Sequence, residues 1–141
     1  MKLRVFLDTN VFIYAFEFPE SNSSKIINLL NEGKIEAVIS ERVLKEVISY
    51  FERKHSSELA KKFRKYLLNN CLLVLKEEVV EQIKELKGKI KDKDIDQIAT
   101  VIKYGMKFLI SYDRDFDSFE EYFTPKKFLE FLKEVASDVE F

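Results

Sequence analysis

The chain has 141 residues, of which 46% are hydrophobic and 35% are charged, a balance typical of one globular domain with a single core. The 24 basic and 25 acidic residues nearly cancel, so any binding to nucleic acid must come from local patches and not from net charge. A single cysteine excludes an intrachain disulfide framework, and no apolar run approaches the roughly 20 residues of a membrane span. We therefore expect one domain over residues 1–141, located in the cytoplasm and without membrane contact.

Buried-strand and amphipathic-helix patterns alternate along the whole chain. The first, Leu3–Leu7, has the consecutive apolar residues of a strand covered on both faces, and Asp8 follows at its C-terminal end. Thr9 or Asn10 is expected to cap the helix that comes next, and Ser40 to cap the helix after the second strand. The other predicted helices cover about 24–31, 41–54, 56–68, 77–86, 94–105 and the segment from 125 onward, and the other predicted strands cover 35–39, 71–75, 107–111 and 122–124.

This alternation predicts a parallel sheet with helices on both faces. The expected fold is therefore of the α/β class, with three α/β/α layers around a central parallel sheet of four to five strands. The segment 71–75 reads CLLVL, so we expect it to be an internal strand of that sheet.

Four acidic residues are predicted to meet at one edge of the sheet. Asp8 and Asp113 each follow a strand, and parallel strands place their carboxyl ends at the same edge. Glu46 lies in the helix that leaves this edge after the second strand, and Asp94 begins the helix that leads into the fourth. On a helical wheel Asp94 borders the apolar stripe, whereas Asp96 falls on the solvent side.

Close carboxylates repel one another, and a hard divalent cation resolves that repulsion. Ligands that are all oxygen favour Mg²⁺ or Mn²⁺, and the absence of a Cys/His cluster argues against zinc. Each aspartate alone has an ordinary structural explanation as a strand end or a helix cap. Asp115 and Asp117 read as turn residues, and Asp115 can add a ligand. The lysines at 84, 87, 89, 91 and 93 read as a solvated face in preference to the wall of a substrate channel.

Four stretches together resemble the PIN-domain family, which includes the VapC-type toxin nucleases. They are Phe6–Val11, Ser40–Val47, Lys91–Ala99 and Leu109–Phe116, and they occur in the family's order. The resemblance implies a ribonuclease that hydrolyses RNA phosphodiester bonds with Mg²⁺ or Mn²⁺. The residues that it places at the catalytic and metal-binding positions are Asp8, Glu46, Asp94 and Asp113, with Asn10, Ser111 and Asp115 in support.

The same resemblance implies partners. Toxin members of the family pair with a small antitoxin protein and often form homodimers, so both are expected in addition to the RNA substrate.

Two other functions compete with the nuclease. One is a non-catalytic PIN-like module that binds RNA or protein through the same acidic pocket. The other is a phosphatase of the haloacid-dehalogenase type, whose motif has an aspartate two residues after the first. Asn10 stands at that position here, which disfavours the phosphatase.

Overall fold

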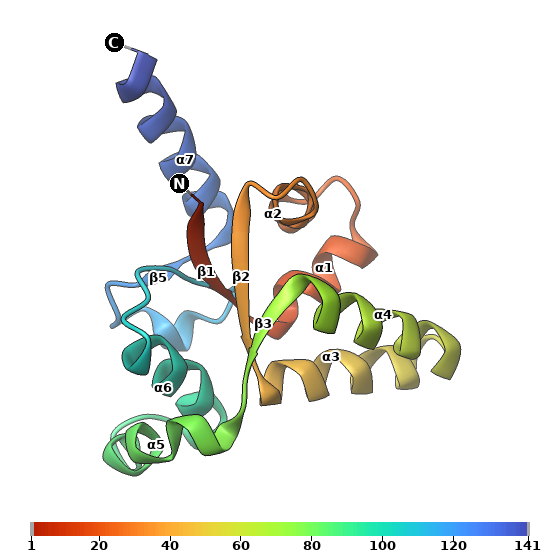
Figure 1. Ribbon diagram of the computed structural model, residues 1–141, viewed down its shortest axis with the longest axis vertical. Coiled ribbons are helices and arrows are strands. Elements are labelled where there is room, and N and C mark those ends of the chain that lie inside the picture. The colour runs from red at the N-terminus through yellow and green to blue at the C-terminus, as the bar shows by residue number, and fades with distance from the viewer. Residues whose placement is uncertain (1, 141) are drawn as a thin grey trace.

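The fold is known from a computed structural model that describes the backbone of residues 2–140 and the side chains of residues 2–133 (Figure 1). Residues 1 and 141, the two ends of the expected domain, lie outside the described part. Within it, no helix is long and apolar enough to cross a membrane.

The centre of the molecule is one sheet of five parallel strands in the order β3-β2-β1-β4-β5, which confirms the predicted fold class. The register pairs Leu7 with Ile110 across β1 and β4, and Ser40 with Val74 across β2 and β3. The strands are β1 (Leu3–Leu7), β2 (Ile35–Ser40), β3 (Cys71–Val74), β4 (Leu109–Ile110) and β5 (Tyr122–Phe123).

Helices cover both faces of this sheet. In the view of Figure 1, α1 to α4 lie to the right of the strands and α5 and α6 to the left. The helices are α1 (Thr9–Glu17), α2 (Asn22–Asn31), α3 (Glu41–Lys54), α4 (Ser57–Asn70), α5 (Val80–Leu86), α6 (Ile95–Lys103) and α7 (Pro125–Glu140), and the 3₁₀ turns are η1 (Lys76–Val79), η2 (Asp92–Asp94) and η3 (Arg114–Phe116).

The caps show where short-range patterns work and where they fail. Ser40 caps α3 as predicted, because its hydroxyl accepts a hydrogen bond from the Val43 N–H at 3.2 Å. The prediction for α1 was wrong, since the cap is neither Thr9 nor Asn10. Asp8 itself takes that place, and its carboxylate accepts the Thr9 N–H at 2.8 Å.

The predicted internal position of segment 71–75 was also wrong. β3 is an edge strand that pairs only with β2, and the side chain of Leu72 is 51% exposed. The apolar run did not indicate that one face of β3 is poorly covered, and it carries no information on what lies beside the strand. The second crossover adds β3 outside β2, and the chain then returns past β1 to form β4.

The central strand β1 fixes the place of the acidic residues. Val5, Phe6 and Leu7 are fully buried, so the strand is held from both faces. The strand order runs outward in one direction through β2 and β3 and in the other through β4 and β5. The crevice at the carboxyl ends of β1 and β4, where these directions diverge, is the usual ligand site of an open α/β sheet.

Candidate metal centre

Asp8 is the innermost acidic residue of this crevice. It directly follows β1, and only 6% of its surface is exposed. One carboxylate oxygen, Oδ1, accepts the Thr9 N–H at 2.8 Å, and the other, Oδ2, accepts the Ser111 hydroxyl at 2.6 Å. These neutral donors fix the direction of the carboxylate but leave its charge uncompensated.

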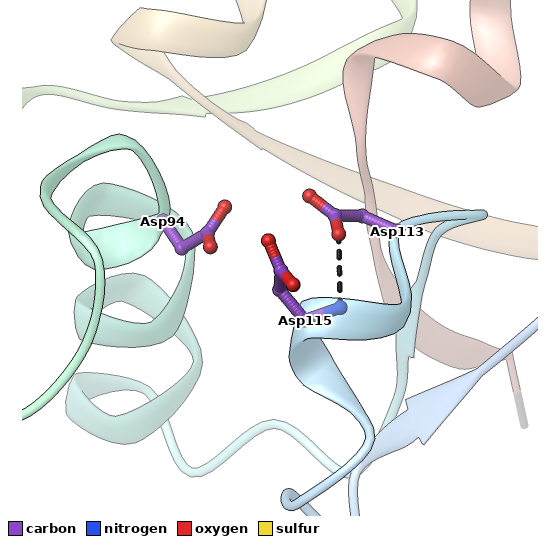
Figure 2. Close-up of side chains that lie close together, drawn as sticks. All are labelled: Asp94, Asp113 and Asp115. Atoms are coloured by element: carbon purple, nitrogen blue, oxygen red, sulfur yellow. Dashed lines mark hydrogen bonds between the residues drawn. The ribbon is translucent and has the colours of Figure 1, made fainter.

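Three further aspartates gather beside it. Asp94, Asp113 and Asp115 each offer a carboxylate oxygen, and these atoms all lie within 4.8 Å of one another (Figure 2). Asp94 is buried at the junction of η2 and α6, whereas Asp113 and Asp115 come from the turn that follows β4. The Asp115 N–H donates to Asp113 Oδ1 at 2.9 Å, so the backbone of η3 sets the spacing of these two side chains.

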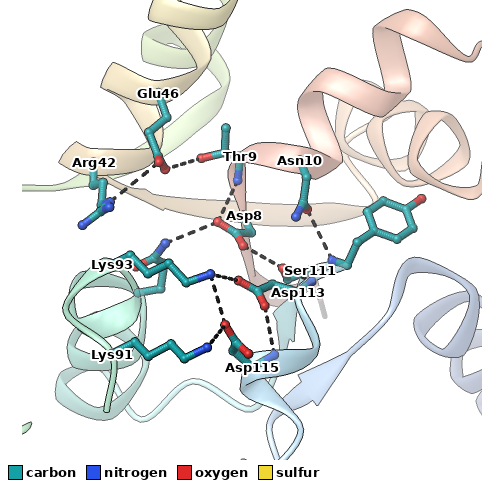
Figure 3. Close-up of polar contacts among 12 residues, drawn as sticks. Asp8, Thr9, Asn10, Arg42, Glu46, Lys91, Lys93, Ser111, Asp113 and Asp115 are labelled. Carbon is teal, nitrogen blue, oxygen red and sulfur yellow. Dashed lines mark hydrogen bonds and ion pairs between the residues drawn. The ribbon is translucent and has the colours of Figure 1, made fainter.

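Ser111 connects Asp8 to this group. Its hydroxyl donates to Asp8 and accepts the Asp113 N–H at 2.9 Å, and the side chain is fully buried. Asn10 makes a parallel link, because its Oδ1 accepts the Tyr112 N–H at 3.3 Å (Figure 3). Both residues therefore tie the end of β1 to the end of β4.

Glu46 reaches the site from α3, on the opposite side of Asp8. Its Oε1 accepts the Thr9 hydroxyl at 2.8 Å, and its Oε2 lies 3.7 Å from Arg42 Nε (Figure 3). Of the four acids that the sequence singles out, Asp94 and Asp113 thus form one group with Asp115. Asp8 is joined to that group through Ser111, and Glu46 is joined to Asp8 through Thr9.

Two lysines of the stretch that was predicted to be a solvated face are exposed as expected, and they also form ion pairs with acids of the site. Lys93 Nζ lies 3.3 Å from Asp113 Oδ2 and 3.1 Å from Asp115 Oδ2, and Lys91 Nζ lies 3.1 Å from the same Asp115 oxygen (Figure 3). The alternation of charged residues did not indicate these pairs, because their partners lie 20 or more residues away in the sequence.

Gln97 is a site residue that the sequence analysis missed. It is buried, and its side-chain amide lies 3.5 Å from Asp8 Oδ1. The other end of the amide lies 3.3 Å from the main-chain oxygens of Lys93 and Asp94. The amide N–H donates to Asp8 in one orientation and to these two main-chain oxygens in the other. The available signal was a polar residue within the apolar stripe of α6, one turn after Asp94.

The pKa values of these carboxyl groups are shifted in different directions. Burial raises the pKa of Asp8, although hydrogen bonds from Ser111, Thr9 and Gln97 oppose the rise. Burial and the neighbouring Asp113 carboxylate raise the pKa of Asp94. Hydrogen bonds from Lys91 and Lys93 lower the pKa of Asp115. The negative charge that most needs a counter-ion thus lies on the inner side of the site.

The donor set fits a hard divalent cation. Three carboxylate oxygens face a common space, a fourth carboxylate lies behind them, and oxygen ligands are those that Mg²⁺ and Mn²⁺ prefer. Asp94, Asp113 and Asp115 are the residues that could hold the ion directly. A cation there would also relieve the repulsion that raises the pKa of Asp94.

Comparisons with known proteins give one family match and several structural likenesses. Residues 5–122 match the family described as PIN domain. No curated protein sequence matches the chain. Among solved structures, a toxin–antitoxin complex from Klebsiella pneumoniae aligns with a TM-score of 0.67 and 19% identity over 86% of this chain and 97% of that one.

Two other structures align over similar lengths. VapBC-1 from nontypeable Haemophilus influenzae gives a TM-score of 0.65 and 15% identity over 89% of this chain and 100% of that one. VapC20 from Mycobacterium tuberculosis is described as a sarcin-ricin loop cleaving toxin. It aligns with a TM-score of 0.63 and 16% identity over 81% of this chain and 93% of that one. These likenesses extend over nearly the whole chain and show the fold.

Proposed function

The chain belongs to the PIN-domain family, and on that premise we propose that it is a divalent-metal-dependent endoribonuclease. The observation that carries the proposal is the convergence of Asp94, Asp113 and Asp115 beside the buried Asp8 at the carboxyl edge of the sheet. A group of this kind suits hydrolysis of a phosphodiester, in which charge develops on phosphate oxygens and on the attacking water.

We assign the catalytic and metal-binding roles to Asp8, Glu46, Asp94 and Asp113, and Asp115 adds a further oxygen ligand. A bound Mg²⁺ or Mn²⁺ ion would supply Lewis acidity at the phosphate and lower the pKa of the attacking water. The chain itself orients these acids through hydrogen bonds from Ser111 to Asp8 and from Thr9 to Glu46.

Ser111 and Asn10 act as supports. Their hydrogen bonds join the ends of β1 and β4, so the carboxylates of Asp8 and Asp113 keep a fixed separation when substrate binds. Lys93 places a positive charge against Asp113 and Asp115, where it limits the repulsion that the acids exert on an approaching phosphate.

We further propose that the chain is the toxin of a toxin–antitoxin pair, blocked by a small antitoxin protein. The support is the likeness to the Klebsiella and Haemophilus complexes, which extends over nearly the full length of both proteins. Expression of the wild-type chain in a bacterial host should then arrest growth, whereas expression of Asp94→Asn should not. Equal growth of the two strains would contradict the toxin assignment.

A homodimer is part of the same proposal. Leu72 is 51% exposed on the open edge of β3, and the nearby Leu68 is 41% exposed, so this edge presents apolar surface that a second copy would cover. Light scattering after size exclusion should give twice the monomer mass, and Leu72→Glu should halve it. A monomeric wild type would contradict this assignment.

The alternative function is a non-catalytic PIN-like module that binds RNA or protein. The lysines that already neutralise Asp113 and Asp115 favour it, because they could stabilise the acidic group with no cation bound. RNA binding that persists in EDTA, without cleavage in Mg²⁺ or Mn²⁺, would identify this function.

The deciding assay measures cleavage of labelled single-stranded and structured RNA in Mg²⁺ and in Mn²⁺. Asp8→Asn and Asp94→Asn should each lower the rate roughly 100-fold or more, because several kcal/mol of charge stabilisation depend on the metal site. Asp92→Asn is the matched control, since Asp92 is an exposed carboxylate only two residues from Asp94. The nuclease proposal fails if wild type cuts neither RNA with either metal, or if the two site variants cut as fast as wild type.

A further inference from the structure

Two cavities flank the acidic group, one on each side. The first has a volume of about 420 Å³ and is bordered by Asp94 and Asp115. The second has a volume of about 470 Å³ and is bordered by Thr9 and Glu46. Both volumes fall within the roughly 300–1,000 Å³ of small-ligand sites. The first cavity shares Asp94 and Asp115 with the candidate metal centre, and the second shares Glu46 and its hydrogen-bond partner Thr9.

The first cavity, which we call the Phe119 pocket, combines apolar walls with positive charge. Phe119 and Ile90 are half-buried and form part of its apolar lining, and Lys89 and Lys91 are exposed on the loop that closes it. A nucleotide has this combination of a flat apolar base and a charged phosphate. Asp94 and Asp115 belong to the lining of the pocket together with these lysines, and Lys91 is paired with Asp115 at 3.1 Å.

The second cavity, which we call the Tyr50 pocket, repeats the arrangement on the far side of Asp8. Tyr50 and Ile13 are half-buried in its lining, and Lys45 and Arg53 supply positive charge. The Tyr50 ring is braced by an edge contact with Phe51, with the ring centres 5.1 Å apart. A flat ring in contact with a neighbouring ring is suited to stacking with a base.

We propose that the Phe119 and Tyr50 pockets are two nucleotide subsites that hold the bases on either side of the scissile phosphate. The inference rests on the proposed function, which places that phosphate at the acidic group. A single RNA strand would cross the site from one pocket to the other, with one base on Phe119, another on Tyr50, and the neighbouring phosphates near the lysines and Arg53. Paired bases cannot enter two separate pockets, so the strand is unpaired at the cleavage point.

Two other cavities share no acid with the candidate metal centre. The apolar cavity of about 370 Å³ between α1, α2 and α4 is lined by Phe12, Phe16 and Phe63 and by none of the site acids. The cavity of about 480 Å³ beside Ile102 also has none of them in its lining. The Ile102 cavity therefore offers a matched control, since Ile102 is an apolar side chain that is 50% exposed.

The test removes a base and an aromatic ring separately and together. Single abasic positions are introduced one at a time around the cleavage point of a labelled RNA, and kcat/KM is measured in Mn²⁺ for wild type, Phe119→Ala, Tyr50→Ala and Ile102→Ala. Loss of one stacked base should lower wild-type kcat/KM about 5- to 150-fold at two positions, one on each side of the cut. Phe119→Ala should be insensitive to one of these positions, and Tyr50→Ala to the other.

Phe119→Leu and Tyr50→Phe guard against loss of folding, because they keep apolar volume at each position. Phe119→Leu should show the same selective loss as Phe119→Ala, whereas Tyr50→Phe should behave as wild type. The subsites are overturned if abasic positions leave wild-type kcat/KM unchanged, or if Ile102→Ala alters the abasic pattern as much as the pocket variants.

A binding measurement separates this inference from the nuclease proposal. Backbone amide shifts of the ¹⁵N-labelled protein are recorded in EDTA with a 2′-O-methyl RNA tetranucleotide and with its abasic counterpart. Base-dependent shifts at residues 88–91 and 118–119 and at 45–53 support the subsites even if no RNA is cut, in which case only the nuclease proposal fails. Shifts that are absent, or identical for the two oligonucleotides, overturn the subsites even if RNA is cut.

Discussion

The acidic group has two halves that are stabilised in different ways. The inner pair, Asp8 and Asp94, is buried, with 6% and 5% of its surface exposed. The outer pair, Asp113 and Asp115, lies closer to solvent. Its carboxylate oxygens form ion pairs with the Nζ atoms of Lys91 and Lys93 at distances of 3.1–3.3 Å. Among the described side chains, no cationic group comes within ion-pair distance of the inner pair.

The difference indicates which half of the site would gain more from a bound cation. Burial raises the pKa of both inner carboxyl groups, whereas the lysines lower the pKa of Asp115. A bound divalent ion therefore gains most from the inner pair, whose carboxylates have no ion-pair partner among the described side chains. The outer pair already has internal counter-ions, which must move or share their carboxylates when an ion binds.

The largest expected effect is on metal affinity. Asp94→Asn should weaken Mn²⁺ binding about 100-fold, and Asp115→Asn about 10-fold or less, within the range found when groups around a metal site are removed. Asp115 contributes less because its charge is already shared with two lysines. Isothermal titration calorimetry measures the Mn²⁺ affinity of both variants. A greater loss of affinity in Asp115→Asn than in Asp94→Asn would contradict the division into two halves.

The next effect concerns the link between the halves. Ser111→Ala removes the hydroxyl that donates to Asp8 and accepts from the Asp113 N–H, and it should lower the free energy of unfolding by about 1–3 kcal/mol. Urea unfolding measures this, with Ser118→Ala as the control because Ser118 is exposed. Equal stability of the two variants would show that the link carries little energy.

Lys93 allows the internal counter-ion to be tested directly. Lys93→Met removes an ammonium that competes with a metal ion for Asp113 and Asp115. Mn²⁺ should therefore bind about fivefold more tightly, which corresponds to the interaction energy of about 1 kcal/mol between two unit charges about 4 Å apart in water. Lys84→Met, at an exposed position on α5, is the control. Unchanged or weaker Mn²⁺ binding in Lys93→Met would mean that the lysine does not compete.

The smallest effect is on stability without metal. The pKa of Asp94 is higher in the folded than in the unfolded chain, so its ionised form opposes folding once the pH exceeds the ordinary value of 3.8. In EDTA at pH 7, Asp94→Asn should therefore need more urea to unfold than wild type, and the gap should shrink at pH 3.5. A gap of the same size at both pH values would contradict an electrostatic origin.

Periodicity accounts for much of the fold and part of the site. Alternating strands and helices predicted the parallel sheet, and the acids after β1 and β4 were expected at one edge for that reason. The edge position of β3 was not predictable because lateral strand order leaves no local pattern. The part played by Gln97 and the pairing of Lys91 and Lys93 with site acids were not predicted, because these contacts join residues 20 or more positions apart.

The central claim is that the inner acids require a divalent ion, and anomalous diffraction from crystals grown with Mn²⁺ tests it most directly. We predict an anomalous peak bonded to carboxylate oxygens of Asp94 and Asp113, with the Lys93 ammonium displaced from Asp113. A map with no peak at the acidic group in saturating Mn²⁺, and with Lys93 still paired to Asp113 and Asp115, would contradict the claim.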